Sequence, residues 1–279
     1  MGANIKQIRS RIKSVDSTLH ITKAMQLVAS SKVRRAKLSA DGATVYADAM
    51  RDAFLNLVSR DTEKSIFVTP PKIGVTCYLL IAGDRGLAGG YNGNLFRLAT
   101  AETAGRRCVY LPIGKRAADF CQRQALPTLS ERSYSSEKLS DLQLSEIAAL
   151  LCDGFRAHQF DAVKVIHTEL LSVLSQEAVC TTLLPLPVTA GSTASVTVYE
   201  PDSETLMQRA VADYLTASLA AAVRESFLCE LYARRNAMDS ATKNAEEMID
   251  ALNLQYNRAR QSSITQEITE IVAGAEGQQ

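Results

Sequence analysis

The sequence predicts an α/β protein in which two long terminal helices form an antiparallel coiled coil and the middle of the chain forms an α/β domain. Three observations predict it: a heptad pattern of apolar residues near the N-terminus, a long C-terminal segment without Gly or Pro, and alternating strand-like and helix-like runs between them. We expect an N-terminal helix over residues 1–60, the α/β domain over 70–200 and a C-terminal helix over 202–279 that pairs with residues 1–60.

The N-terminal helix is predicted from the spacing of apolar residues. Residues 3–41 contain no Gly and no Pro. Spacings of three and four residues separate Ile5, Ile8, Ile12, Val15 and Leu19, which is the pattern of a coiled-coil seam. The phase then changes to Ile21, Met25 and Val28, and we interpret the change as a stutter that alters the supercoil without ending the helix. The helix is expected to continue to about residue 58, through Tyr46, Met50, Phe54, Leu57 and Val58.

The C-terminal helix is predicted from residues 202–273, which contain neither Gly nor Pro and begin with an N-cap and early acids. A helix of about 70 residues is about 105 Å long, whereas a compact protein of this length has a radius of gyration of about 19 Å, so the helix must extend beyond any domain. A second seam is expected at Ala241, Ala245, Met248, Leu252, Gln255 and Ala259. Each helix could instead fold back on its own domain, but two such segments at opposite ends favour a coiled coil.

The middle of the chain predicts a layered α/β domain. Residues 74–83 form an apolar, β-rich run between glycines, typical of a strand buried on both faces. Further strands are expected at 108–113, 162–167, 178–186 and 195–199, and helices at about 93–104, 115–124 and 140–158. This alternation predicts a mostly parallel sheet.

The charge of the chain is nearly balanced, with 31 Lys and Arg against 30 Asp and Glu, which excludes attraction of nucleic acid or membrane by total charge. Residues 1–37 are an exception, because they contain nine basic residues and only one acidic residue, Asp16. A solvated helix face is one interpretation, and an acidic partner is the other. Among nucleic acid, a membrane surface and protein carboxylates we favour a protein, because the basic block itself contains the seam.

No pattern predicts an active site, a metal site or a cofactor. The six cysteines and three histidines lack the spacing of zinc ligands, and we interpret the cysteines as structural thiols. The glycine-rich turn at 83–93 matches neither a P-loop nor a dinucleotide fingerprint, so backbone crowding is expected to explain its glycines. No secretory signal or uninterrupted membrane span is evident, and we expect a soluble, cytosolic protein.

Three separated segments resemble the gamma subunit of bacterial F-type ATP synthase. The first comprises IRSRIKSV at 8–15, ITKAM at 21–25 and VASSK at 28–32, the second is DRGLAGGYN at 84–92, and the third covers residues 256–275. The resemblance implies an antiparallel coiled coil with a Rossmann-like α/β domain. It also implies a non-catalytic rotor shaft that couples ion flow through the membrane sector to ATP synthesis on the beta subunits.

The resemblance further implies partners and location. The partners are the alpha and beta subunits of the catalytic ring, the epsilon and delta subunits and the c-ring, with no nucleic acid and no cofactor, at the cytoplasmic face of the cell membrane. Exposed ion pairs are worth only about 0 to 1 kcal/mol each, so a basic collar of Lys23, Lys32, Arg34 and Arg35 suits replaceable contacts. The implied contact residues are Lys23, Met25, Arg34, Arg35, Arg258, Arg260, Gln261, Thr265 and Glu267.

Two other classes of protein are alternatives: a coiled-coil adaptor with an α/β ligand-binding domain, and a nucleotide-dependent enzyme. The enzyme would need the phosphate motif that the glycine turn lacks. The adaptor would tolerate any substitution at Arg260 and Gln261 that preserves the seam, whereas a shaft would not.

Overall fold

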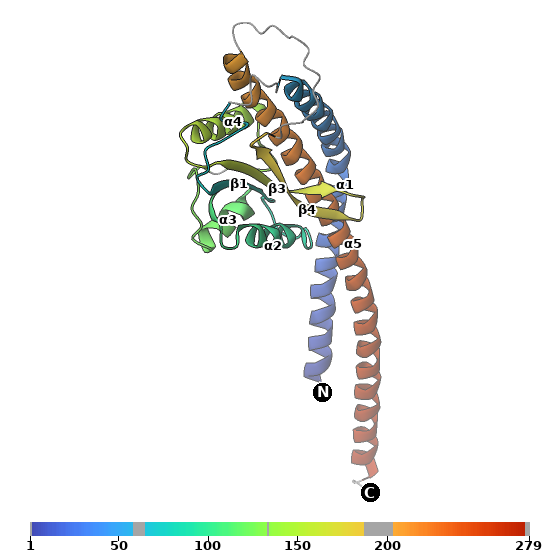
Figure 1. Cartoon of the computed structure of the whole chain (residues 1–279). Coiled ribbons are helices and arrows are strands. Elements are labelled where there is room, and N and C mark those ends of the chain that lie inside the picture. The colour runs from blue at the N-terminus through green and yellow to red at the C-terminus, as the bar shows by residue number, and fades with distance from the viewer. Residues whose placement is uncertain (1, 58–64, 133, 187–202, 277–279) are drawn as a thin grey trace. The chain divides into compact units, whose positions relative to one another are not determined.

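The computed structural model describes residues 2–57, 65–132, 134–186 and 203–276 (Figure 1). In chain order the elements are α1 (Gly2–Leu57), β1 (Val75–Ile81), α2 (Tyr91–Thr103), β2 (Arg107–Ile113), α3 (Lys115–Arg123), α4 (Asp141–Arg156), β3 (Ala162–Leu170), β4 (Gln176–Leu184) and α5 (Ser203–Glu276). The helices and strands predicted within these ranges are present, with ends that shift by a few residues. The strand expected at 195–199 lies outside the described residues.

Contacts divide the chain into two compact units. The coiled-coil unit comprises Met1–Ala29 and Arg235–Gln279, and the sheet unit comprises Ser30–Arg234. Both divisions fall inside the long helices, so α1 and α5 each contribute to both units. The boundaries expected from the sequence follow secondary structure instead, and they place all of α1 and α5 outside the α/β domain. None of the described helices has an apolar stretch long enough to cross a membrane.

Among the described residues, the sheet unit contains four strands in the order β2-β1-β3-β4. β1 pairs in parallel with both β2 and β3, whereas β4 runs antiparallel to β3. The predicted mostly parallel sheet is therefore confirmed, and its one antiparallel strand lies at an edge. Mixed sheets of this kind commonly carry an antiparallel edge strand.

Helices cover both faces of this sheet (Figure 1). Alternate residues of β1 point to opposite faces. Cys77, Leu79 and Ile81 lie in a core with α4 and the first part of α5, while Tyr78 and Leu80 lie in a second core with α2 and α3. Burial on both faces explains why β1 is continuously apolar in the sequence.

The coiled-coil unit pairs the two ends of the chain in antiparallel orientation. The Thr242 hydroxyl donates to Thr22 Oγ1 at 2.8 Å, and Gln26 Nε2 donates to Asp239 Oδ1 at 2.9 Å. Moving forward along α1 therefore means moving backward along α5. The antiparallel coiled coil predicted from the sequence is confirmed.

The stutter predicted in α1 is wrong. Ile21 is 60% exposed and Val28 is 55% exposed. The inward positions instead keep spacings of three and four residues through Thr22, Gln26 and Ala29, and Tyr46 is also exposed. The interpretation of the sequence followed apolar residues, whereas the seam accepts two polar side chains whose hydrogen bonds are satisfied across the helix pair.

The seam predicted in the second half of α5 is partly wrong. Ala245 and Leu252 are buried as expected, but Met248 is 46% exposed and Gln255 is exposed. The inward positions of the coiled-coil unit are Met238, Thr242, Ala245, Ile249, Leu252, Tyr256 and Ala259. These residues also follow a heptad, but in another phase than the predicted one. Because this phase includes a polar Thr, it is less hydrophobic than the predicted seam and is not favoured by hydrophobicity alone.

The hydrogen bond between Thr22 and Thr242 gives a testable prediction. Thr22→Val should leave the buried Thr242 hydroxyl without an acceptor, at a cost of about 1 to 2 kcal/mol, whereas Thr22→Val with Thr242→Val should be nearly neutral. Amide exchange of residues 238–252 measures the effect. A double variant that loses as much protection as the sum of the two single variants would contradict the assignment.

Candidate functional site

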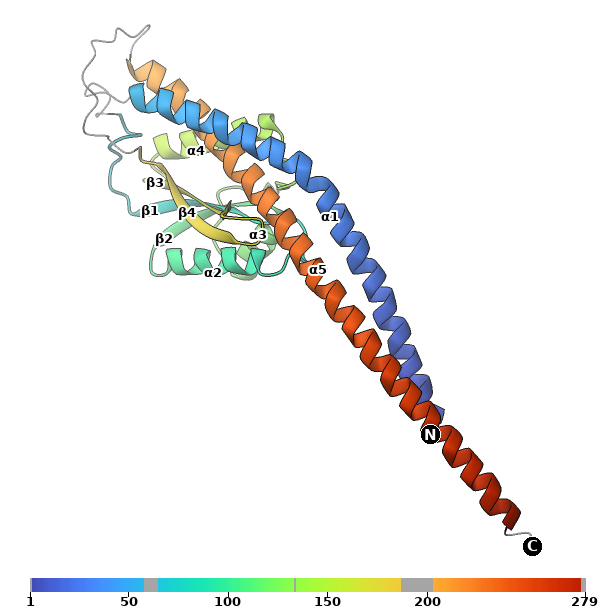
Figure 2. The same cartoon turned by 90° about the vertical axis from the view of Figure 1, so that its right-hand side faces the viewer.

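The C-terminal part of α5 displays most of the predicted contact residues. Arg260, Gln261, Thr265 and Glu267 are all exposed, and α5 continues past the N-terminal end of α1 (Figure 2). Their hydrogen bonds are local, because Thr265 Oγ1 donates to the Gln261 carbonyl at 3.0 Å. The polar side chains of this segment can therefore contact another molecule while the helix stays folded.

The same segment carries exposed apolar side chains. Ile264, Ile268 and Ile271 are 48%, 57% and 71% exposed. Their spacings of four and three residues place them on one face of the helix. These three side chains form an exposed apolar stripe, a feature that is common at interaction sites.

A shallow groove lies nearer the N-terminus of α1. Gln7, Ile8 and Arg11 from α1 and Leu252, Gln255, Arg258 and Ala259 from α5 line it. Neither Arg11 nor Arg258 forms an ion pair with any residue in the described part of the chain. The groove is therefore lined by two arginines that are not engaged in ion pairs with described residues, together with apolar and amide side chains.

The predicted basic collar is less available than its sequence indicates. Lys23 Nζ lies 2.7 Å from Glu246 Oε1 within the coiled-coil unit, and Lys32 Nζ lies 2.5 Å from Glu137 Oε1 within the sheet unit. Met25 is half-buried, whereas Arg34 and Arg35 are exposed. The predicted contact residues are distributed over both units and form no single site within either one.

The glycine-rich turn after β1 is a structural junction. The Asp84 carboxylate accepts hydrogen bonds from the Lys115 amide at 3.0 Å, the Ser135 hydroxyl at 2.6 Å and the Glu137 amide at 3.2 Å. Burial acts to raise the pKa of Asp84, but these hydrogen bonds outweigh it and hold the pKa below its ordinary value. Asp84 thus joins the turn to α3 and to the segment before α4.

The backbone crowding expected at the glycines of this turn is not found at Gly83, where a side chain makes the close approach. A Cβ at Gly83 would lie 2.8 Å from the Glu230 carboxylate. Gly114 has a φ of 94°, and a Cβ there would lie 1.9 Å from the Ala82 carbonyl oxygen. Gly114 lies outside the 83–93 turn, and there the close backbone and the positive φ require glycine.

A buried ion pair holds this turn against α5. Arg234 Nη2 donates to Glu230 Oε1 at 2.5 Å and to the Gly86 carbonyl at 3.2 Å. Glu230 is 3% exposed and Arg234 is 9% exposed. Burial raises the pKa of Glu230, and Arg234 opposes that rise. This pair was not predicted from the sequence, although an acid and a base four residues apart in an apolar stretch of helix are a recognisable signal.

The thiols and the buried histidine are unsuited to catalysis. Burial raises the pKa of Cys77 and Cys229 to about 12, so both remain protonated thiols. Burial lowers the pKa of His167 to about 4, which keeps its ring neutral. Within the described ranges, no cluster of three or more His, Cys, Asp or Glu residues could hold a metal ion.

Comparisons with known proteins identify the family. The family model described as ATP synthase matches residues 4–277. The chain is 36% identical to the "ATP synthase gamma chain, sodium ion specific" of Acetobacterium woodii, over 99% of each chain. It is 39% identical to the ATP synthase gamma chain of Ruminococcus albus, over 96% of each. This chain belongs to the ATP synthase gamma-chain family.

Solved structures agree with the fold of a gamma chain. A chain of the Euglena gracilis mitochondrial ATP synthase, in a structure of its OSCP, F1 and c-ring, superposes with a TM-score of 0.72 at 17% identity and covers 99% of this chain and 95% of its own. A chain from the central stalk and c-ring of the Tetrahymena thermophila mitochondrial enzyme gives 0.62 at 23% identity, covering 79% and 99%. At these identities the likeness concerns the fold.

Membership in the gamma-chain family confirms the predicted function at the level of the family. The chain is a rotor-shaft subunit of an ATP synthase and is not the catalytic subunit. The adaptor and nucleotide-dependent enzyme alternatives are therefore set aside. The individual contact residues expected from the resemblance remain predictions.

Proposed function

We propose that this gamma chain transmits torque to the catalytic ring of alpha and beta subunits through the exposed C-terminal end of α5, and so couples ion flow through the membrane sector to ATP synthesis. The observation that carries the proposal is the surface of residues 260–269 and 271–272, where polar and apolar side chains are exposed on one uninterrupted helix. A shaft needs such a surface, because it must contact the ring without losing its own structure.

The stiffness of α5 and of the helix pair supports a role in transmitting torque. α5 runs from Ser203 to Glu276 without a break, and Pro and Gly, which bend helices, are absent from residues 203–273. Small side chains such as Ala245 at inward positions let the two helices of the coiled-coil unit approach closely. Such a pair resists bending better than a single helix.

Two kinds of contact are proposed with the ring. Arg260, Gln261, Thr265 and Glu267 contact a polar loop of a beta subunit, while Ile264, Ile268 and Ile271 slide against apolar side chains. Lys23, Arg34, Arg35 and Arg258 are proposed to meet carboxylates of the beta subunits, and Met25 is proposed to lie near the region where those carboxylates approach. Exposed ion pairs of this type are weak, about 0 to 1 kcal/mol, and can be exchanged as the shaft turns.

Membership in the family supports a proposal for the remaining partners. We assign the epsilon subunit and the c-ring as the partners at the foot of the shaft, and the delta subunit as a member of the same complex. The location is the cytoplasmic face of the cell membrane, as a peripheral subunit. Recovery of these subunits with the tagged chain from native membranes tests the assignment, and their absence would contradict it.

Arg260→Ala tests the polar contact. We expect complexes that carry it to assemble with a several-fold lower rate of ATP hydrolysis and of ATP-driven ion pumping, because the beta-subunit partner of Arg260 is left unpaired. Helicity of the chain should not change, since an exposed helix position tolerates Ala. Both rates are measured on reconstituted complexes.

Gln208→Ala is the matched control for this experiment. Gln208 is an exposed residue of α5 within the sheet unit, and its truncation should leave both rates unchanged. If Arg260→Ala and Gln208→Ala both behave like the unmodified complex, the contact at Arg260 is wrong. Family membership would be unaffected by that result.

A further inference from the structure

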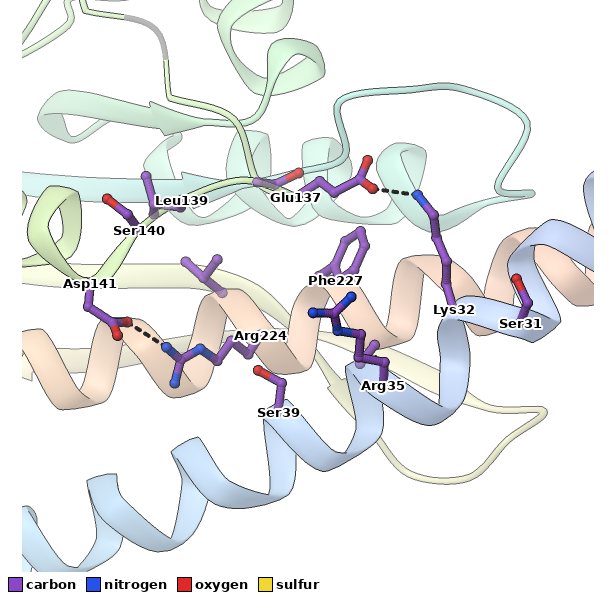
Figure 3. Close-up of a pocket in the computed structure, with 13 residues that line it drawn as sticks. Ser31, Lys32, Arg35, Ser39, Glu137, Leu139, Ser140, Asp141, Arg224 and Phe227 are labelled. Carbon is purple, nitrogen blue, oxygen red and sulfur yellow. Dashed lines mark hydrogen bonds and ion pairs between the residues drawn. The ribbon is translucent and has the colours of Figure 1, made fainter.

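A pocket of about 700 Å³ in the sheet unit lies between α1, the segment that leads into α4, and α5 (Figure 3). Lys32 and Arg35 reach it from α1, Glu137 and Asp141 from the segment at the start of α4, and Arg224 from α5. Its lining therefore contains one more basic than acidic residue. Among the shaft contact residues proposed above, Arg35 alone also lines this pocket.

The charged groups in the pocket are unequally engaged. Lys32 forms its ion pair with Glu137, and Arg224 Nη2 lies 2.5 Å from Asp141 Oδ1. No ion pair or hydrogen bond joins the Arg35 side chain to any residue that the structure describes. Figure 3 shows the guanidinium of Arg35 directed into the pocket, apart from both ion pairs. One cation is thus available to an incoming group.

A buried hydroxyl group supplies an independent observation. Ser136 lines the same pocket, is only 5% exposed, and its Oγ has no hydrogen-bond partner. Buried hydroxyl groups are nearly always hydrogen-bonded, and an unpaired one costs about 1 to 3 kcal/mol. A ligand that accepts a hydrogen bond from Ser136 would remove that cost.

We infer that this pocket binds an oxyanion of the phosphate class, either free inorganic phosphate or the phosphoryl group of a small molecule such as a nucleotide. The planar guanidinium of Arg35 can donate two parallel hydrogen bonds to such an anion, and Ser136 donates a third. The N-terminus of the 16-residue helix α4 begins at the pocket edge and adds a favourable partial positive charge. The carboxylates of Glu137 and Asp141 oppose the anion only weakly, because each has its own cation.

The apolar lining leaves room for a ligand body larger than phosphate. Leu139, Val223 and Phe227 line the pocket, and its volume lies in the range of about 300 to 1,000 Å³ that is typical of small-molecule sites. The experiment therefore compares inorganic phosphate, ADP and adenosine, so that the head group and the body are tested separately.

Calorimetric titration of the purified full chain tests the inference, with chloride at matched ionic strength as the reference. We expect saturable phosphate binding at one site, weakened about tenfold or more by Arg35→Gln and measurably by Ser136→Ala. Lys37→Gln removes the same charge from the same helix, and it should bind phosphate as the unmodified chain does. Lys37 is exposed and does not line the pocket.

The titrations distinguish the possible ligands of the pocket and can also overturn the inference. Tighter binding of ADP than of phosphate, with none of adenosine, would assign the phosphoryl group of a nucleotide, whereas equal binding of ADP and phosphate would assign the free ion. The inference is overturned by adenosine binding as tightly as ADP, by an equal loss in Lys37→Gln, or by the absence of saturable phosphate binding. Circular dichroism of each variant verifies that the chain remains folded.

Discussion

Deletion of residues 1–29 is expected to unfold the C-terminal part of α5 while the sheet unit stays folded. The deletion removes the α1 half of the coiled-coil unit, so Met238, Ala245 and Leu252, which are buried, would face water. Without tertiary packing, a helix keeps little stability of its own. The cut falls at residue 29 because later residues of α1, such as Ala36 and Ala40, pack on α5 within the sheet unit.

Amide exchange measures this effect residue by residue. Residues 238–259 should lose most of their protection in the truncated chain, whereas β1 and α5 residues 205–232 should keep theirs. Lys23→Ala is the matched control, because it removes the ion pair with Glu246 and leaves the seam intact, and its cost should be about 0 to 1 kcal/mol. Equal protection of residues 238–259 in the full and truncated chains would refute mutual dependence of the two helices.

Arg234→Met is expected to destabilise the sheet unit by about 3 to 5 kcal/mol, since it leaves the Glu230 carboxylate buried without its cation. The variant also removes the donor to the Gly86 carbonyl. Replacing both partners, with Glu230→Leu and Arg234→Met, should recover much of the loss, because the cost comes from the unpaired charge. Amide exchange of β1 reports the free energy of unfolding of the sheet unit.

The pH dependence of this variant follows from the direction of the Glu230 pKa. Burial raises that pKa in the folded chain, and Arg234 counteracts the rise. A carboxyl group whose folded pKa is raised stabilises the fold at low pH, and this contribution is lost as the pH rises through the folded pKa. Removing Arg234 strengthens the effect, so the penalty should be smaller at acid pH, where Glu230 is protonated, than at neutral pH.

Arg209→Met is the control for Arg234→Met. Arg209 is exposed on α5 in the sheet unit, so the same substitution there changes the same charge without leaving a buried partner. Its effect should stay within about 0.5 kcal/mol. A penalty for Arg234→Met that is no larger than for Arg209→Met, or that is independent of pH, would contradict the assigned role of the pair.

The sequence alone predicted the long helices and the strands well, because their signals are local. The absence of Gly and Pro from residues 202–273 and the apolar run of β1 need no knowledge of partners. The spacing of the glycines showed that the turn lacks phosphate motifs, but the close approach at Gly83 comes from the Glu230 side chain and not from backbone. The contact residues of the candidate site came from resemblance to the family and await the variants described above.

Only the tertiary structure decided the phase of the heptad seams in α1 and α5 and the pairing of polar and charged side chains. Thr22 and Thr242 occupy inward positions because each satisfies the other across the helix pair, and a hydrophobicity pattern cannot register a hydrogen bond between residues so far apart in sequence. The same reason hid the pair of Lys32 with Glu137. The charge and hydrophobicity of a residue can be read from the sequence position by position. Whether its side chain is free to contact a partner depends on which groups the fold brings within about 3 Å of it.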